Sequence, residues 1–262
     1  MITESKKREF SNGVVYKLYT DDGYPIEVTD TFLPFYTKNC VNDKTNELKN
    51  YYLGDRSERW MIGVSCMSGC PVRCKFCATG KLKKWRNLTA EEIVEQIEFV
   101  LERNPNFIPN NSQEFKINYT RMGEPMLNIE AVRKAIEIID SRYENVHHYI
   151  STIGIEGMDV SWIKDNITLQ LSLHSLDESR RNELIPYNKK MTIESLGSVR
   201  TMSKLKTTLN MTLVDMEDFN IAKLQKHFNP NHFFIKLSPI NENEISDKNM
   251  LGKGIIDKVN LV

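Results

Sequence analysis

Three cysteines stand close together near residue 70, in a spacing that suits metal binding. Cys70, Cys74 and Cys77 fall in the segment CPVRCKFC, which is a C-x3-C-x2-C pattern. Thiolate sulfur is a soft ligand that suits iron–sulfur clusters and zinc. Three thiolates on a short loop can hold three irons of a cubane cluster and leave one iron open for reaction. The spacing therefore predicts a metal centre, either such a cluster or a zinc site.

Cys66 leaves a second arrangement open. As a fourth ligand it would give a closed zinc or cluster site with a structural role. It lies inside a predicted strand, however, so we expect it to point into the core as a free buried thiol. With Cys40 the chain has five cysteines. An odd number, with four close together, makes a poor disulfide framework.

The composition is that of an ordinary globular protein. Of 262 residues, 40% are apolar and 27% are charged, and 35 basic residues balance 35 acidic ones. No apolar run approaches the roughly 18 residues of a membrane helix. The sequence starts with the charged segment MITESKKREF, without the apolar stretch of a signal peptide. We expect a cytoplasmic protein with no membrane association. Its neutral charge balance leaves only a local patch for binding nucleic acid.

Strands and helices alternate from residue 61 onward. Apolar or alternating runs predict strands, apolar residues at helical spacing predict helices, and Thr89 with Glu92 forms a capping box. The predicted strands cover 61–67, 114–120, 147–153, 167–174, 207–214 and 232–240. The predicted helices cover 89–101, 129–142, 160–164, 178–184, 193–205 and 221–228. Before them we expect strands at 14–18 and 27–33, a turn at 21–25, and a loop or short helix at 39–51.

This alternation predicts an α/β fold with a parallel sheet. Right-handed crossovers would curl six such units into a partial (β/α)6, TIM-like barrel. We expect residues 1–60 to be a small N-terminal extension, 61–245 the barrel core and 246–262 a C-terminal tail. Active sites of such sheets lie at the carboxyl ends of the strands. The residues expected to share that edge are Cys70–Cys77, Gly123–Pro125, Ser151, His174 and Asn241.

The cysteine pattern, with an aromatic residue before its third cysteine, resembles that of the radical S-adenosylmethionine (SAM) superfamily. A longer series of motifs is similar to the RlmN/Cfr-type RNA methyltransferases of that superfamily. The resemblance covers roughly residues 61–241 in the right order. The motifs that carry it are GCPVRCKFCATG at 69–80, RNLTAEEI at 86–93, MGEP at 122–125, ISTIG at 150–154, LSLHS at 171–175, LIPYN at 184–188 and LSPIN at 237–241.

The resemblance implies a barrel of the radical SAM type that binds a [4Fe-4S] cluster and SAM. Cys70, Cys74 and Cys77 would hold the cluster. The matched positions imply SAM contacts from Phe76, Gly123, Glu124, Ser151, Ser172, Leu173, His174 and Asn241. Without the resemblance, Gly123 and Glu124 would also suit a plain turn, Ser151 a strand hydroxyl with a hydrogen-bond partner, and His174 a hydrogen-bonded histidine of the core. No side chain is assigned a catalytic role.

The sequence departs from the RlmN/Cfr pattern at two cysteines. That family uses a resolving cysteine seven residues before the first cluster cysteine, where this chain has Gly63, and a methyl-carrying cysteine near the C-terminus, whereas no cysteine follows Cys77. The known methyl shuttle cannot run without them. The family's N-terminal accessory domain is missing or reduced, and Glu27 or Asp30 could fill the place of a carboxylate proposed there as a base.

The function expected from these features is reductive cleavage of SAM to a 5′-deoxyadenosyl radical that modifies an RNA or nucleotide. An electron donor such as flavodoxin or ferredoxin is implied. Two alternatives remain open: a small-molecule or peptide substrate, and an inactive relative that holds a cluster or zinc and binds RNA. The basic segment at 81–86, which includes Trp85, could contact phosphates or form a solvated face.

Overall fold

The structure is a computed structural model that describes residues 2–33, 35–36, 51–214, 218–238, 240 and 243–251. Internal contacts divide the chain into two compact units. The first unit consists of Met1–Ser65, Leu88–Arg121 and Glu130–His148, and the second consists of Cys66–Asn87, Met122–Ile129 and Tyr149–Val262. None of the described helices is long and apolar enough to cross a membrane.

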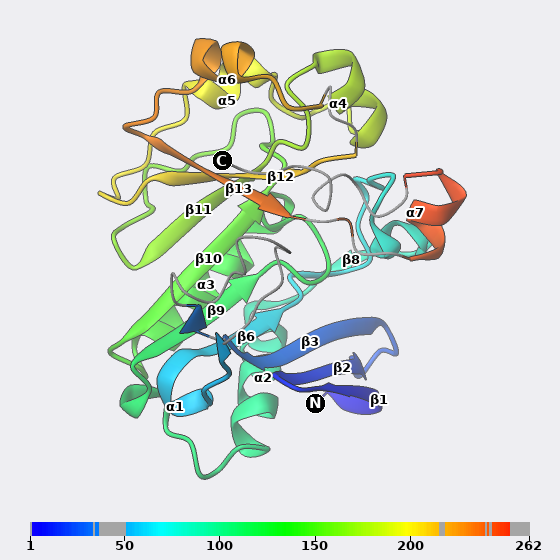
Figure 1. The fold of residues 1–262 in the computed structure, drawn as a ribbon. Coiled ribbons are helices and arrows are strands. Elements are labelled where there is room, and N and C mark those ends of the chain that lie inside the picture. The colour runs from blue at the N-terminus through cyan, green and yellow to red at the C-terminus, as the bar shows by residue number, and fades with distance from the viewer. Residues whose placement is uncertain are drawn as a thin grey trace. The chain divides into compact units, whose positions relative to one another are not determined.

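The first unit is built on five hydrogen-bonded strands in the order β1 (Thr3–Phe10), β2 (Gly13–Tyr19), β3 (Pro25–Phe32), β6 (Trp60–Val64) and β9 (Glu114–Tyr119). The first four strands pair antiparallel, and β6 pairs with β9 in parallel. Figure 1 shows β1, β2 and β3 side by side in blue. The sequence predicted β2 and β3 but missed β1, whose residues are all exposed and lack an apolar face.

Helix α2 of the first unit begins at the capping box that its sequence predicts. In α2 the Thr89 hydroxyl accepts from the Glu92 amide at 3.2 Å, and the Glu92 carboxylate accepts from the Thr89 amide at 2.9 Å. The predicted capping box is thereby confirmed. The other elements of this unit are β4 (Phe35–Tyr36), β5 (Tyr51–Tyr52), α1 (Arg56–Arg59), α2 (Ala90–Glu102), η2 (Pro109–Asn111), α3 (Ile129–Asp140) and the start of β10 (Val146–Thr152).

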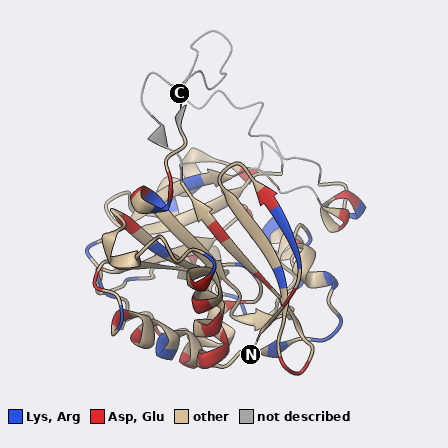
Figure 2. Ribbon diagram, turned by 90° about the horizontal axis from the view of Figure 1, so that it is seen from below, with Lys and Arg blue, Asp and Glu red and all other residues tan. Residues whose placement is uncertain are grey.

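The second unit contains three parallel strands in the order β11 (Ile167–Ser172), β12 (Thr207–Thr212) and β13 (Phe233–Ser238). Figure 1 shows helices α5 and α6 together beside β12 and β13. The remaining elements are β7 (Met67–Ser68), η1 (Ala78–Lys81), β8 (Arg86–Asn87), η3 (Pro125–Leu127), the end of β10, α4 (Glu178–Leu184), α5 (Ile193–Gly197), α6 (Ile221–His227) and α7 (Glu244–Lys248). Basic and acidic residues both occur on the helices and on the strands of the ribbon (Figure 2).

All six predicted core strands are present as β6 and β9 to β13, but two helix predictions are wrong. Residues 160–164 form turns, because the carboxylate and carbonyl of Asp159 bind the Ser161 amide and the Trp162 indole instead of continuing a helix. The helix predicted over 193–205 ends at Gly197. A Cβ at Gly197 would lie 2.1 Å from the carbonyl oxygen of His227, so the chain turns where it packs closely against α6.

A buried carboxylate organises the core of the first unit. Asp30, on β3, is 1% exposed. It accepts from the guanidinium of Arg56 at 2.7 and 2.9 Å, from the indole of Trp60 at 2.9 Å and from the amide of Asn104 at 3.0 Å. These donors take up both carboxylate oxygens. Asp30 is therefore a structural residue.

Replacing Asp30 by alanine should lower the free energy of unfolding by about 3–5 kcal/mol, because it leaves the half-buried Arg56 charge and the Trp60 indole without their acceptor. Urea denaturation followed by circular dichroism measures this loss. Asp21→Ala, at an exposed turn position, is the matched control and should change the stability by less than about 0.5 kcal/mol. Equal effects of the two substitutions would contradict the structural role of Asp30.

Candidate metal and nucleotide site

The cysteine loop is held in place by backbone geometry and by apolar packing. It follows Gly69, whose φ of +74° and whose contacts leave no room for a side chain, since a Cβ would lie 2.7 Å from the Lys84 carbonyl oxygen. Arg73, between the first two cysteines, also takes a left-handed φ of +56°. The Lys75 amide donates to the Leu184 carbonyl at 2.9 Å. These constraints fix the loop against the carboxyl end of α4.

An apolar cluster supports two of the three thiols, those of Cys70 and Cys74. It consists of Val72, Ile153, Leu184, Ile185, Val214, Ile240 and Leu251, and Cys70, Cys74 and Phe76 pack against it. Burial raises the pKa of Cys70 to about 12 and raises that of Cys74 well above the usual range. The charges of Cys70 and Cys77 raise the pKa of Cys74 further. Thiolates at these positions would therefore repel one another. A cationic centre bound between them would offset that repulsion.

This donor set fits a cluster. Cys70, Cys74 and Cys77 are free, half-buried thiols on one loop. Within the described part of the chain, no three His, Cys, Asp or Glu side chains converge as ligands of one metal ion. Each ligand of a cubane binds a different iron, so cluster ligands need not converge on one point.

Cys66 has a structural place. Its side chain is 1% exposed, and its thiol donates to the Met122 carbonyl oxygen at 3.5 Å. Burial is the main reason that its pKa lies well above the usual value. The expectation that it points into the core is confirmed, although β6 ends at Val64, two residues before it.

Gly123 and Glu124 form a tight turn after β9. Gly123 has a φ of +104°, and a Cβ there would lie 2.6 Å from the side chain of Met67. The Glu124 carboxyl is 3% exposed and accepts from the amides of Ile153 at 3.0 Å and Met126 at 3.1 Å. Burial raises its pKa to about 7, while its hydrogen bonds, led by that from Thr152, act in the opposite direction. A buried carboxyl with acceptor capacity therefore lies in the same unit as the cysteine loop.

His174 lies just beyond β11 in a left-handed conformation with φ +60°. Its Nδ1 accepts from the Thr212 amide at 3.1 Å, so the proton of the neutral ring is on Nε2. Burial lowers its pKa to about 3. The ring packs edge-to-face on Phe76 at 4.7 Å between centroids. His174 is thus a neutral hydrogen-bond donor that packs against Phe76, the residue before Cys77.

Two predicted serines meet across adjacent strands. The hydroxyls of Ser151 and Ser172 are 3.4 Å apart, and the Asn210 amide lies 3.4 Å from Ser151. Leu173 is fully buried, and its amide donates to the Asn210 carbonyl at 2.9 Å. The structure thus brings Phe76, Gly123, Glu124, Ser151, Ser172, Leu173 and His174 into one unit with the cysteines. Asn241 and Cys40 lie outside the described residues.

Sequence reasoning missed Asn210 and Gln170. The Asn210 amide donates to the Gln170 side chain at 3.1 Å, and the Asn210 Oδ1 is buried with no partner among the described residues. Both residues are amides in the middle of strands β12 and β11. Polar residues inside otherwise apolar strands were the available signal, because a buried amide needs partners.

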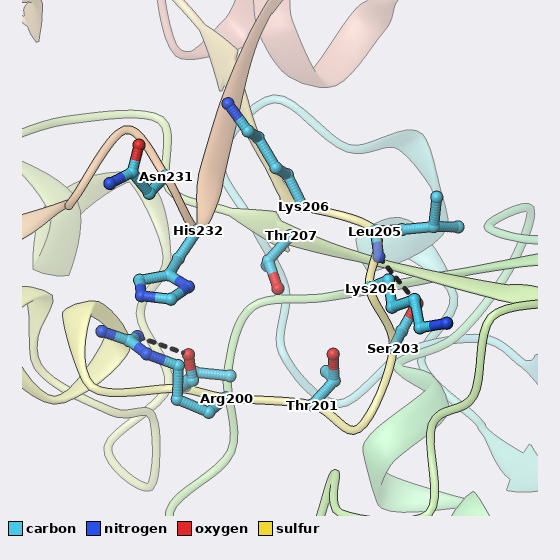
Figure 3. Close-up of a pocket in the computed structure, with 10 residues that line it drawn as sticks. Arg200, Thr201, Ser203, Lys204, Leu205, Lys206, Thr207, Asn231 and His232 are labelled. Atoms are coloured by element: carbon cyan, nitrogen blue, oxygen red, sulfur yellow. Dashed lines mark hydrogen bonds between the residues drawn. The ribbon is translucent and has the colours of Figure 1, made fainter.

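A separate basic cavity of about 60 Å³ lies at the amino ends of β12 and β13. It thus lies at the opposite end of β12 from Thr212, which binds His174. Figure 3 shows the Thr201 and Thr207 hydroxyls pointing toward one another across it. Its lining residues are Val199, Arg200, Thr201, Ser203, Lys204, Leu205, Lys206, Thr207, Asn231 and His232. No sequence motif pointed to this cavity.

Comparison with known proteins identifies the family. Residues 64–226 match the model of the radical SAM superfamily, and the chain belongs to that superfamily. Members of the family bind a [4Fe-4S] cluster and SAM. The resemblance seen in the sequence is thereby confirmed, as is the α/β fold of the radical SAM type.

Curated relatives carry a more specific name. The chain is 33% identical over 202 residues to a probable dual-specificity RNA methyltransferase RlmN from Chlorobium phaeobacteroides (strain BS1), covering 74% of this chain and 56% of the relative. It is 36% identical over 173 residues to the dual-specificity RNA methyltransferase RlmN of Helicobacter hepaticus (strain ATCC 51449 / 3B1), covering 62% and 46%. The chain spans about half the length of these relatives.

A solved structure shares the fold. The crystal structure of a radical SAM methyltransferase from Sphaerobacter thermophilus matches with a TM-score of 0.66 and 21% sequence identity. The match covers 97% of this chain and 75% of that one. It therefore extends beyond the residues that match the superfamily model.

The raised pKa of Glu124 predicts a pH-dependent stability in the metal-free protein. The folded carboxyl holds its proton up to about pH 7, whereas the unfolded one releases it near 4.5. The stabilisation is therefore full below pH 4.5 and is lost as the pH rises to about 7, by up to about 3 kcal/mol. The difference in unfolding free energy between the wild type and Glu124→Gln should fall over this range. Glu130→Gln, on the exposed side of α3, is the control. A constant difference for Glu124→Gln would contradict the raised pKa.

Proposed function

We propose that this chain cleaves SAM reductively at a [4Fe-4S] cluster and uses the resulting radical to modify RNA. The observation that carries the proposal is the set of three free thiols on one short loop, of which Cys70 and Cys74 pack with Phe76 against a single apolar cluster. Cys70, Cys74 and Cys77 would hold the cluster. In that chemistry one electron splits the sulfonium of SAM into methionine and a 5′-deoxyadenosyl radical. A flavodoxin- or ferredoxin-type protein would supply the electron.

The residues around the loop suit the polar groups of SAM. Glu124 offers a buried carboxyl that can accept from the ammonium of the methionine part, and the backbone of Gly123 allows close approach. His174 offers Nε2–H as a neutral donor, because its Nδ1 is already an acceptor. The hydroxyls of Ser151 and Ser172 can bind the ribose or the carboxylate. Leu173, Phe76 and Asn241 are proposed as further contacts from their matched positions.

Gly63 bears on the methyl-transfer step. It stands where the RlmN/Cfr family has its resolving cysteine and pairs with Thr29 across β3 and β6. A Cβ at Gly63 would lie 2.4 Å from the Thr29 hydroxyl and 2.9 Å from the Arg121 side chain, which forms an ion pair with Glu27. A thiol at this position would require the Thr29 and Arg121 side chains to shift. Any methyl transfer by this chain would therefore proceed without a resolving thiol at residue 63.

An RNA substrate is supported by the relatives and by an exposed basic segment. The curated relatives are named RNA methyltransferases. Directly after the cysteine loop, Lys83 and Lys84 are exposed, and Trp85 is 47% exposed. Cations that contact phosphates beside an aromatic ring on which a base can stack are typical of single-strand binding.

Cluster binding is tested by the cysteines themselves. After anaerobic reconstitution, wild-type protein should contain iron and sulfide and should convert SAM to 5′-deoxyadenosine with dithionite. Cys70→Ala, Cys74→Ala and Cys77→Ala should each lose most of both, because each removes one ligand, whereas Cys66→Ala should keep them. Metal analysis and chromatography measure these outcomes. Stoichiometric zinc in place of iron, or loss of the cluster in Cys66→Ala, would overturn the assignment.

RNA binding is tested by comparing two pairs of lysines. The double variant Lys83→Ala/Lys84→Ala should weaken binding of a single-stranded RNA and reduce the dependence of affinity on salt by roughly 0.7 per lost phosphate contact. Lys204→Ala/Lys206→Ala, in the basic cavity, removes the same charge elsewhere and should bind nearly as wild type. Fluorescence anisotropy at several salt concentrations measures both. If both variants lose affinity equally, the segment has no specific role.

A further inference from the structure

The basic cavity at the amino ends of β12 and β13 contains a buried hydroxyl without a protein partner. Thr207, the first residue of β12, is 5% exposed, and it lines the cavity. Its amide donates to the His232 carbonyl at 2.9 Å, which joins the starts of the two strands. Its hydroxyl has no hydrogen-bond partner among the described residues. Because buried polar groups in proteins are normally hydrogen-bonded, this hydroxyl is available to a group that enters the cavity.

The charged side chains that line the cavity are all basic. Arg200, Lys204 and Lys206 contribute positive charge, and the lining includes no Asp or Glu side chain. The carboxylate of Asp165, which lies outside the lining, accepts from the backbone amide of Lys204 at 2.7 Å. A cavity whose walls carry charge of one sign attracts ions of the opposite sign. The lining therefore favours an anion.

Arg200 is held by contacts that leave part of its guanidinium available. Its Nη1 donates to the carbonyls of Gly197 at 2.9 Å and Val199 at 2.7 Å, and its cation lies 5.5 Å from the centre of the Phe233 ring. Its Nε and Nη2 have no partner among the described residues. In Figure 3, Arg200 and His232 lie on the same side of the cavity. The remaining donors of a fixed guanidinium suit an oxyanion, which can accept two hydrogen bonds from them.

The size of the cavity limits the anion that can enter. Its volume of about 60 Å³ is enough for several water molecules or one small tetrahedral group. A terminal phosphate carries up to two negative charges and three acceptor oxygens, so it can use several donors at once. The internal phosphodiesters of RNA are substituted on two oxygens and are expected to stay outside. RNA chains are therefore expected to bind elsewhere on the protein.

We propose that this cavity binds a terminal phosphate group, as inorganic phosphate or as the phosphate monoester of a small metabolite. Arg200 and Lys206 would balance its charge, and the hydroxyls of Thr201 and Thr207, which point toward one another across the cavity in Figure 3, would donate to its oxygens. The site is separate from the cysteine loop and requires no metal. Phosphate binding and radical chemistry can therefore fail independently.

Isothermal titration calorimetry of the full chain tests the site with inorganic phosphate, and chloride at equal ionic strength is the blank. Titrations with ribose 5-phosphate and ribose distinguish the two sources of the phosphate group. Thr207→Val removes the hydroxyl and keeps a β-branched side chain of similar size. Thr208→Val makes the same change at the next buried position of β12, outside the lining. Lys206→Met removes a charge from the cavity, and Lys226→Met removes one from an exposed position on α6.

We expect one saturable site in the wild type and binding at least about tenfold weaker in Thr207→Val and Lys206→Met, because each loses a donor to a charged group. Thr208→Val and Lys226→Met should bind as the wild type does. Tighter binding of ribose 5-phosphate than of inorganic phosphate, with none of ribose, identifies a phosphate monoester, and binding of inorganic phosphate alone identifies the free ion.

Two results would refute the site. The first is the absence of saturable binding of both inorganic phosphate and ribose 5-phosphate to the wild type. The second is equal weakening by each cavity variant and its control. Lys206→Met, at an exposed position, decides the question if Thr207→Val does not fold.

Discussion

The rest of the second unit depends on one constraint, the burial of the Cys70 and Cys74 thiols against an apolar cluster. Metal binding requires Cys70, Cys74 and Cys77 to lose their protons, whereas burial alone keeps the first two protonated. Such a loop is therefore stable with protons on sulfur or with a cationic centre between the sulfurs. The left-handed residues Gly69 and Arg73 and the packing on Val72 and Leu184 hold the loop in either state. Its geometry can thus precede the metal.

Burial favours the neutral forms of two polar groups around the loop, His174 and Glu124. His174 is kept uncharged by burial, and Glu124 is shifted toward its neutral form. The buried cations Arg181 and Lys190 donate to backbone carbonyl oxygens. In the first unit the buried charge is an anion, Asp30, which is matched by Arg56 and its other donors.

Two glycines, Gly123 and Gly63, occupy their positions for different structural reasons. At Gly123 the positive φ and the contact with Met67 require glycine for the turn itself. At Gly63 the backbone is ordinary strand, and the obstacle to a side chain is the Thr29 hydroxyl on the paired strand. The first glycine therefore serves the shape of the site. The second stands where the RlmN/Cfr pattern has a cysteine, and a side chain there would require Thr29 and Arg121 to shift.

The sequence alone determined the six core strands, the α2 capping box and the identity of the family, because these depend on local periodicity and on motif spacing. It also separated Cys66 from the other cysteines by its place inside a predicted strand. It did not reveal β1, the early end of α5 at Gly197 or the role of Asp30, since each depends on partners distant in sequence. Arg181 reads in the sequence as a helix-surface arginine like its neighbour Arg180. Only tertiary packing decides that Arg181 is fully buried while Arg180 pairs with Glu183 at the surface, because burial is a property of what folds over a residue.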